Sequence, residues 1–106
     1  LVGDYEITGD LVLRLLAQEE RHPAFQPLLQ RGRHAHEAWV NRIFSEPLDA
    51  LTGAARDARV AQLVAATDVF TWKLWRRDRG MPARKVADLM FDMTARLNAP
   101  AAGRSR

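Results

Sequence analysis

The spacing of the apolar residues constrains the fold of this chain more than any other feature. Apolar side chains recur every three or four residues along most of the sequence, and no stretch alternates between apolar and polar as a half-buried strand does. Residues three and four apart share one face of an α-helix. The sequence therefore predicts an all-α fold of four antiparallel helices, near residues 9–21, 24–51, 54–78 and 82–98.

Capping residues, prolines and a glycine place the ends and bends of the first two helices. Thr8 or Asp10 can cap the first helix, and Pro23 ends it because the residue before a proline is pushed out of helical geometry. Pro47 is expected to kink the second helix or to begin a new turn there. Gly32 inside that helix costs roughly 1 kcal/mol relative to alanine, which indicates a close helix approach or a bend.

Length and composition exclude several classes of protein. The chain has 106 residues, enough for one domain, and it has no cysteine for disulfides or Cys-based metal sites. No apolar run approaches the roughly 20 residues that span a bilayer, and we expect a cytoplasmic protein without membrane contact. The net charge of +3 comes mostly from arginines dispersed along the chain, which argues against nucleic-acid binding. Because the chain begins at Leu1, we expect an upstream part to be missing.

Residues 54–78 carry two apolar stripes on opposite sides, whereas a helix on the outside of a bundle needs one. The other three helices could hardly bury both stripes. We therefore expect the last two helices to pair with their copies in a second chain, forming a homodimer. The predicted dimer interface consists of residues of the second stripe together with one aromatic residue of the last helix: Ala61, Ala65, Val69, Trp72 and Phe91. The alternative is that the second stripe packs on a missing part of the same chain.

The sequence lacks the residue sets that carry catalysis or hold metals. Ser45 and Ser105 are its only serines, which leaves no plausible Ser-His-Asp arrangement. His34 and His36 are two residues apart and face different sides of a helix, so they cannot share one metal ion. There is no HExxH sequence and no glycine-rich phosphate loop. We expect no enzymatic activity, no metal and no cofactor.

A largely apolar pocket is predicted between the first three helices, where two long apolar faces must oppose each other. Its expected lining residues are Leu16, Phe25, Leu29, His36, Trp39, Ile43, Thr67, Phe70 and Thr71. The same residues could instead form an ordinary filled core, with His36 a hydrogen-bonded buried histidine. Asp68, at the edge between the two stripes, either orients an effector or makes a structural hydrogen bond or salt bridge.

Three segments resemble the C-terminal half of TetR-family transcriptional regulators. They are GDLVLRLLAQEE at residues 9–20, GRHAHEAWV at residues 32–40 running into Ile43 and Phe44, and LVAATDVFTWKL at residues 63–74 followed by RRDRG at residues 76–80. Each segment alone is weakly specific, but their order and the helix lengths fit the family, and together they span most of residues 9–97.

The resemblance implies a bacterial all-helical homodimer in which residues 1–98 form the effector-binding and dimerisation domain and residues 99–106 a flexible tail. In this family a small-molecule effector shifts the spacing of two N-terminal helix-turn-helix heads and releases operator DNA. This chain contains no helix-turn-helix, so the resemblance implies that it senses and dimerises but binds DNA only through the missing part. The competing interpretation is a helical protein-interaction module of an unrelated multidomain protein.

Overall fold

The computed structural model describes residues 1–100, and within that range the chain is all-α without a strand, as predicted. The predicted division into four helices is too coarse, because two of the expected helices are broken. The helices are α1 (Val2–Ala17), α2 (Gln26–Ile43), α3 (Ser45–Asp49), α4 (Gly53–Ala66), α5 (Val69–Lys73) and α6 (Ala83–Leu97), with a 3-10 turn at Pro23–Phe25 and a π-helical turn at Leu74–Asp78. The predicted tail lies outside the described residues from residue 101 onward.

The first helix begins earlier than predicted and ends earlier, since α1 covers Val2–Ala17 rather than residues 9–21. Thr8 does not cap it. The Thr8 hydroxyl instead donates to the carbonyl oxygen of Asp4 at 3.0 Å, one turn back within the helix. This local bond satisfies the hydroxyl inside a helix, so that threonine does not mark a helix start here.

The second predicted helix is interrupted at Phe44, where the backbone leaves helical geometry with φ −106° and ψ 26°. Pro47 begins a new turn, which is the second of the two outcomes expected for it, since its ring would clash with the carbonyl oxygen of Ile43 in a continuous helix. It lies in the first turn of α3, where its missing N–H would have had no intrahelical partner. Gly32 meets no close approach either, because a Cβ built there would have no atom within 4 Å.

The third predicted helix is broken between α4 and α5, and this break is the main departure from expectation. Asp68 has extended geometry, with φ −71° and ψ 156°, and its carboxylate accepts a 2.9 Å hydrogen bond from the backbone N–H of Phe70. Asp68 therefore caps α5. Short polar side chains that bond to nearby backbone compete with helix continuation, and such a bond is present at this position.

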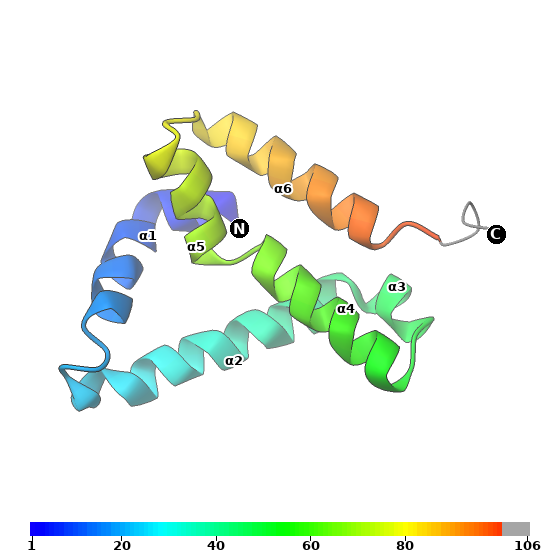
Figure 1. Ribbon diagram of the computed structural model, residues 1–106, viewed down its shortest axis with the longest axis horizontal. Helices are drawn as coiled ribbons and strands as arrows, with labels where there is room; N and C mark the ends of the chain where they lie inside the picture. The colour runs from blue at the N-terminus through cyan, green and yellow to red at the C-terminus, as the bar shows by residue number, and fades with distance from the viewer. Residues whose placement is uncertain (101–106) are drawn as a thin grey trace.

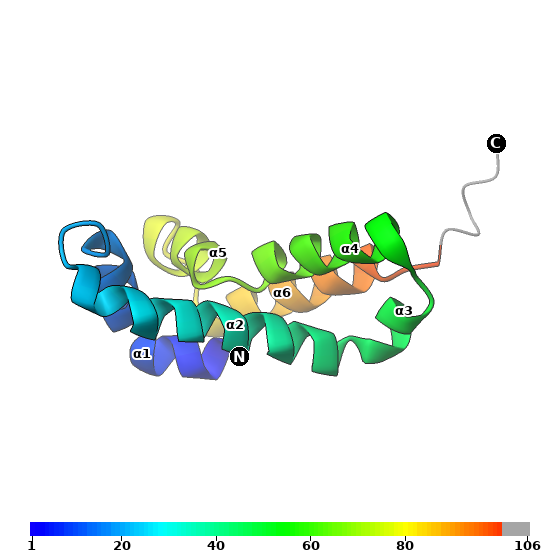
Figure 2. The same cartoon turned by 90° about the horizontal axis from the view of Figure 1, so that it is seen from below.

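The helices pack in two layers, with α4 and α5 on one side and α2 on the other. Figure 1 shows α1 and α2 meeting at one corner, with α5 beside α1, and α6 running alongside α4. Figure 2 shows α4 and α5 in a layer above α2. The extents of 49 × 31 × 22 Å agree with this arrangement, because two helices of about 10 Å diameter fill the short dimension.

Two hydrophobic clusters form the core. One contains Val69, Trp72, Val86 and Met90, packed between α1, α5 and α6, and the other contains Val40, Leu48 and Leu63, between α2, α3 and α4. Trp72 is fully buried in the first cluster. Gly9 lies on the face of α1 that packs against Trp72. A Cβ at this position would lie 2.7 Å from the indole, so this close packing requires glycine.

The break at Asp68 also changes the predicted dimer interface. Val69 and Trp72 are 6% and 0% exposed within a single subunit, so they do not lie on a surface that a second chain could cover. The second apolar stripe was predicted for residues 54–78 as one straight helix. The break turns α5, so that Val69 and Trp72 face α1 and α6 instead. Ala61, Ala65 and Phe91 are exposed, and their role in a dimer stays a prediction.

Candidate functional site

A cavity of about 650 Å³ lies between α1, α2 and the junction of α4 with α5. It opens to solvent on one side, and its walls are mostly apolar. The apolar lining residues are Leu1, Val12, Leu15, Leu16, Leu28, Leu29, Ala35, Trp39, Val69 and Phe70. Six polar side chains and one glycine complete the lining: Asp4, Tyr5, Thr8, Arg33, His36, Asp68 and Gly32.

The structure brings together five of the nine residues predicted for a pocket: Leu16, Leu29, His36, Trp39 and Phe70. The other four lie elsewhere. Phe25 contacts the ring of His22 in the 3-10 turn, and Ile43 is 53% exposed at the end of α2. Thr67 is buried behind the wall, and the hydroxyl of Thr71 donates to the carbonyl oxygen of Ala65 at 2.6 Å.

Sequence reasoning missed the contribution of the first turns of α1, which supply Leu1, Asp4, Tyr5 and Thr8 to the cavity. The omission follows from starting the first helix near residue 9. A signal was available, because Tyr5, Val12 and Leu16 are spaced seven and four residues apart and share one helical face.

Thr67 joins three elements at the inner end of the cavity. The hydroxyl of Tyr5, from α1, donates to the carbonyl oxygen of Thr67 at 2.8 Å. The break after Thr67 leaves that carbonyl without a helical partner, so the tyrosine satisfies a group that the break has freed. From α2, His36 Nε2 lies 2.9 Å from Thr67 Oγ1.

The hydrogen-bond pattern also assigns the proton on His36. The Thr67 hydroxyl has one hydrogen, and it is directed at the carbonyl oxygen of Leu63, 2.7 Å away. Thr67 Oγ1 must then accept from His36, which places a hydrogen on Nε2 of the imidazole. The ring also stacks on Trp39, with centroids 5.7 Å apart and planes inclined by 17°. His36 is thus a hydrogen-bonded residue of the wall.

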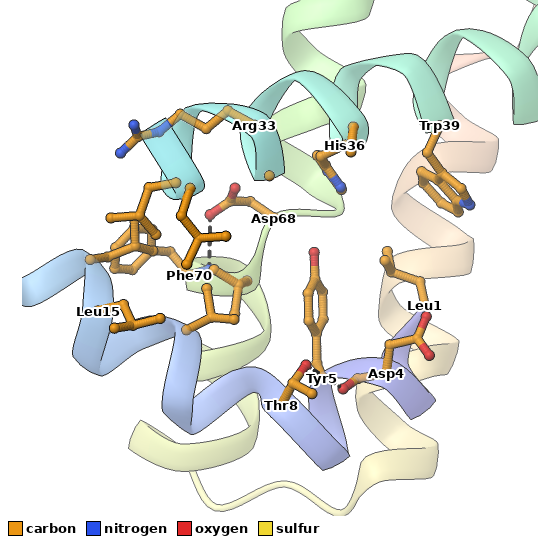
Figure 3. Close-up of a pocket in the computed structure, with 17 residues that line it drawn as sticks. Leu1, Asp4, Tyr5, Thr8, Leu15, Arg33, His36, Trp39, Asp68 and Phe70 are labelled. Atoms are coloured by element: carbon orange, nitrogen blue, oxygen red, sulfur yellow. Dashed lines mark hydrogen bonds between the residues drawn. The ribbon is translucent and has the colours of Figure 1, made fainter. Parts of the chain in front are cut away.

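The charged groups of the cavity are unequally paired. Arg33 makes two bonds to the carboxylate of Glu19, at 2.6 and 2.9 Å, and this pairing lowers the pKa of Glu19. In Figure 3 the guanidinium of Arg33 extends away from Asp68, whereas Tyr5 and His36 point toward each other across the cavity. Asp68 uses Oδ2 to cap α5, and its Oδ1 accepts no hydrogen bond from residues 1–100.

Burial raises the pKa of the Tyr5 hydroxyl well above its usual value, and the nearby carboxylates of Asp68 and Asp4 raise it further. The tyrosine therefore stays protonated and acts as a hydrogen-bond donor throughout the physiological range. Both carboxylates act on the same buried hydroxyl, as a second cause after burial.

Within residues 1–100 no group of three or more His, Cys, Asp or Glu side chains is placed to hold a metal ion. None of the helices in that range is both long and apolar enough to cross a membrane. Comparisons of the chain with protein-family models, with curated proteins and with solved structures give no match.

Proposed function

We propose that this chain is the ligand-sensing and dimerisation domain of a TetR-type transcriptional repressor, and that a small, largely apolar effector binds in the cavity between α1, α2 and α5. The cavity is the observation that carries the proposal. Its volume of about 650 Å³ lies within the range of roughly 300 to 1,000 Å³ typical of small-molecule sites. Apolar walls with a few convergent polar groups are also typical of such sites.

A ligand in this cavity would contact α1, α2 and the first turn of α5 at once. Those three elements are also joined by the bonds of Tyr5 and His36 to Thr67. A ligand that binds one arrangement of these helices better than another shifts the population toward it. In an intact repressor such a shift would reach the DNA-binding heads and release the operator.

Gly32 allows a sharp test of ligand binding, because it lines the cavity and has open space where its Cβ would be. Gly32→Phe should occupy part of the cavity, because the side chain starts in open space, and Gly32→Ala should leave the cavity open while also raising helix propensity. Thermal-shift and calorimetric screening with neutral aromatic compounds should show binding to the parent chain and to Gly32→Ala, but not to Gly32→Phe. Binding that is equal in all three would place the ligand elsewhere.

The repressor assignment has its own test in the intact gene. A helix-turn-helix encoded upstream of Leu1 would support it, and a gel shift with the isolated chain at physiological salt should then show no sequence-specific complex. The second candidate is a helical protein-interaction module. It is favoured by Ile7 and Leu11, which are 85% and 51% exposed and lie one turn apart on the outer face of α1. An upstream region without a DNA-binding motif would favour this alternative.

A further inference from the structure

The charges that line the cavity point to one chemical class of ligand. Its lining contains two carboxylates, Asp4 and Asp68, and one guanidinium, Arg33. Arg33 is already paired with Glu19, which does not line the cavity. Glu19 therefore compensates most of the Arg33 charge from outside the cavity, and the Asp68 carboxylate keeps charge that a ligand can meet.

Asp68 has the capacity to bind a cation while it keeps its structural role. Its Oδ2 accepts the capping bond from Phe70 at 2.9 Å, and its Oδ1 has no hydrogen-bond donor among residues 1–100. Figure 3 shows the Asp68 carboxylate at the wall of the cavity, on the same side as His36, with its capping bond to Phe70 drawn as a dashed line. His36 Nε2 and the Tyr5 hydroxyl both donate to Thr67, so neither of these two donors is committed to Asp68.

Aromatic rings in the same lining add a second attraction for a cation. Tyr5, Trp39 and Phe70 all line the cavity. The face of an aromatic ring attracts an ammonium group, and the attraction is stronger where solvent is excluded. A site that combines carboxylates with aromatic rings in an apolar cavity matches an organic cation better than it matches an anion or an inorganic metal ion, which would need more oxygen ligands.

We propose that the ligand of this cavity is an aromatic organic cation, with its amine or quaternary ammonium group beside Asp68 and Tyr5 and its apolar body against Trp39 and Phe70. This inference rests on the proposed ligand-sensing function and specifies its ligand.

The test compares three probes that share a naphthylethyl group and differ in the head: trimethylammonium, hydroxyl or carboxylate. Each is titrated by calorimetry into the full chain and into its Asp68→Asn variant. Asparagine caps helices about as well as aspartate, so this substitution removes the charge and keeps the cap. Circular dichroism and the melting temperature show whether the variant remains folded.

The proposal expects the trimethylammonium probe to bind and Asp68→Asn to weaken it about fivefold, since a nearby opposite charge at a partly exposed site is worth on the order of 1 kcal/mol. The alcohol should change by less than about twofold, as expected when no charge is involved, and the carboxylate should bind most weakly to the parent chain. Asp4→Asn should have a smaller effect in the same direction.

Two other results distinguish a wrong ligand class from a wrong ligand-sensing function. If the alcohol or the carboxylate binds as well as the cation, or if Asp68→Asn weakens all three probes equally, the cationic ligand class is wrong and the cavity remains a ligand site. If none of the three probes binds to the parent chain or to Gly32→Ala, the proposed ligand-sensing function fails, and the present inference fails with it.

Discussion

The hydroxyl of Tyr5 donates a 2.8 Å hydrogen bond to the main-chain oxygen of Thr67, which is 62 residues away in the sequence. This bond joins the first helix to the point where α4 gives way to α5. Thr67 is 3% exposed, so water cannot readily replace the tyrosine as the partner of its carbonyl group. The break in the helix and the position of α1 are thus coupled through one side chain.

Tyr5→Phe should therefore lower the free energy of unfolding by about 1 to 2 kcal/mol, because it leaves a buried carbonyl oxygen without a donor. Urea denaturation monitored by circular dichroism measures the change. Thr8→Val is a suitable control on the same helix. It removes an exposed bond to the carbonyl oxygen of Asp4, and it should cost less than about 0.5 kcal/mol. Equal stability of Tyr5→Phe and the parent chain would show that this bond does not hold the break in place.

The fold class followed from apolar periodicity alone, because that pattern reports which face of a helix is buried. It does not report where a long helix is interrupted. At Asp68 the interruption depends on a side chain that bonds to the backbone N–H of Phe70, and helical spacing of the apolar residues continues on both sides. A two-stripe pattern computed through that point assigned Val69 and Trp72 to an outer surface, whereas the turn of α5 buries both.

For the candidate site too, periodicity predicted the residues on buried helical faces but not those at helix ends and breaks. Residues on the predicted inner faces of continuous helices, such as Leu16, Leu29 and Trp39, line the cavity. Three of the four misplaced residues lie next to helix ends or breaks: Phe25 in a 3-10 turn, Ile43 at the end of α2, and Thr67 at the break. The fourth, Thr71, lies within the short α5, and its hydroxyl bonds back across the break to Ala65. The positions of such residues depend on local backbone geometry, which the periodicity of side chains does not encode.

Gly9 and Gly32 give a matched pair for a second prediction. Gly9→Ala should destabilise the chain by about 1 to 3 kcal/mol, because the new methyl group would lie 2.7 Å from Trp72 Cζ3 and the fully buried indole cannot move aside freely. Gly32→Ala should instead stabilise it by up to about 1 kcal/mol through helix propensity. Chemical denaturation of both variants should show shifts of opposite sign, and a stabilised Gly9→Ala would contradict the close packing of α1 on Trp72.

A third prediction concerns Glu6, which joins α1 to the π-helical turn. Its carboxylate accepts a 2.8 Å bond from Trp72 Nε1 and bonds at 2.9 and 3.1 Å from Arg76 Nε. The bond from Arg76 is the main cause of a pKa that is lower in the folded chain than the ordinary value of 4.5, and the bond from Trp72 lowers it further. The folded state therefore favours the charged form of Glu6.

A lowered folded-state pKa contributes stability that is fully present above the unfolded value and is lost as the pH falls through the folded value. Glu6→Gln should consequently be less stable than the parent chain at neutral pH, and the gap should narrow as the pH falls below the ordinary value of 4.5 and through the lower folded-state pKa. Glutamine can still accept the bond from Trp72, so the comparison isolates the charge. Asp10 and Glu19 also have lowered pKa values, but both residues are present in the parent chain and in the variant, so they do not contribute to the difference in stability. A gap that does not vary between pH 7 and pH 3 would contradict this assignment.

The last prediction concerns the proposed homodimer. Since Val69 and Trp72 are buried within the subunit, a charge at either position would unfold the chain and would say nothing about dimerisation. Phe91 is the better probe, because it is 76% exposed on α6 and its replacement removes little packing inside the subunit. Static light scattering of the parent chain at micromolar concentration should give twice the 12.0 kDa mass of one chain. Phe91→Glu should give the mass of one chain with an unchanged circular dichroism spectrum, because a charge in a dry, twofold interface faces its own copy or an apolar neighbour.

Ile7→Glu introduces the same charge at another exposed apolar residue, on α1, and should remain a dimer. If Ile7→Glu dissociates and Phe91→Glu does not, the interface lies on α1, and a monomeric parent chain would rule out the homodimer altogether.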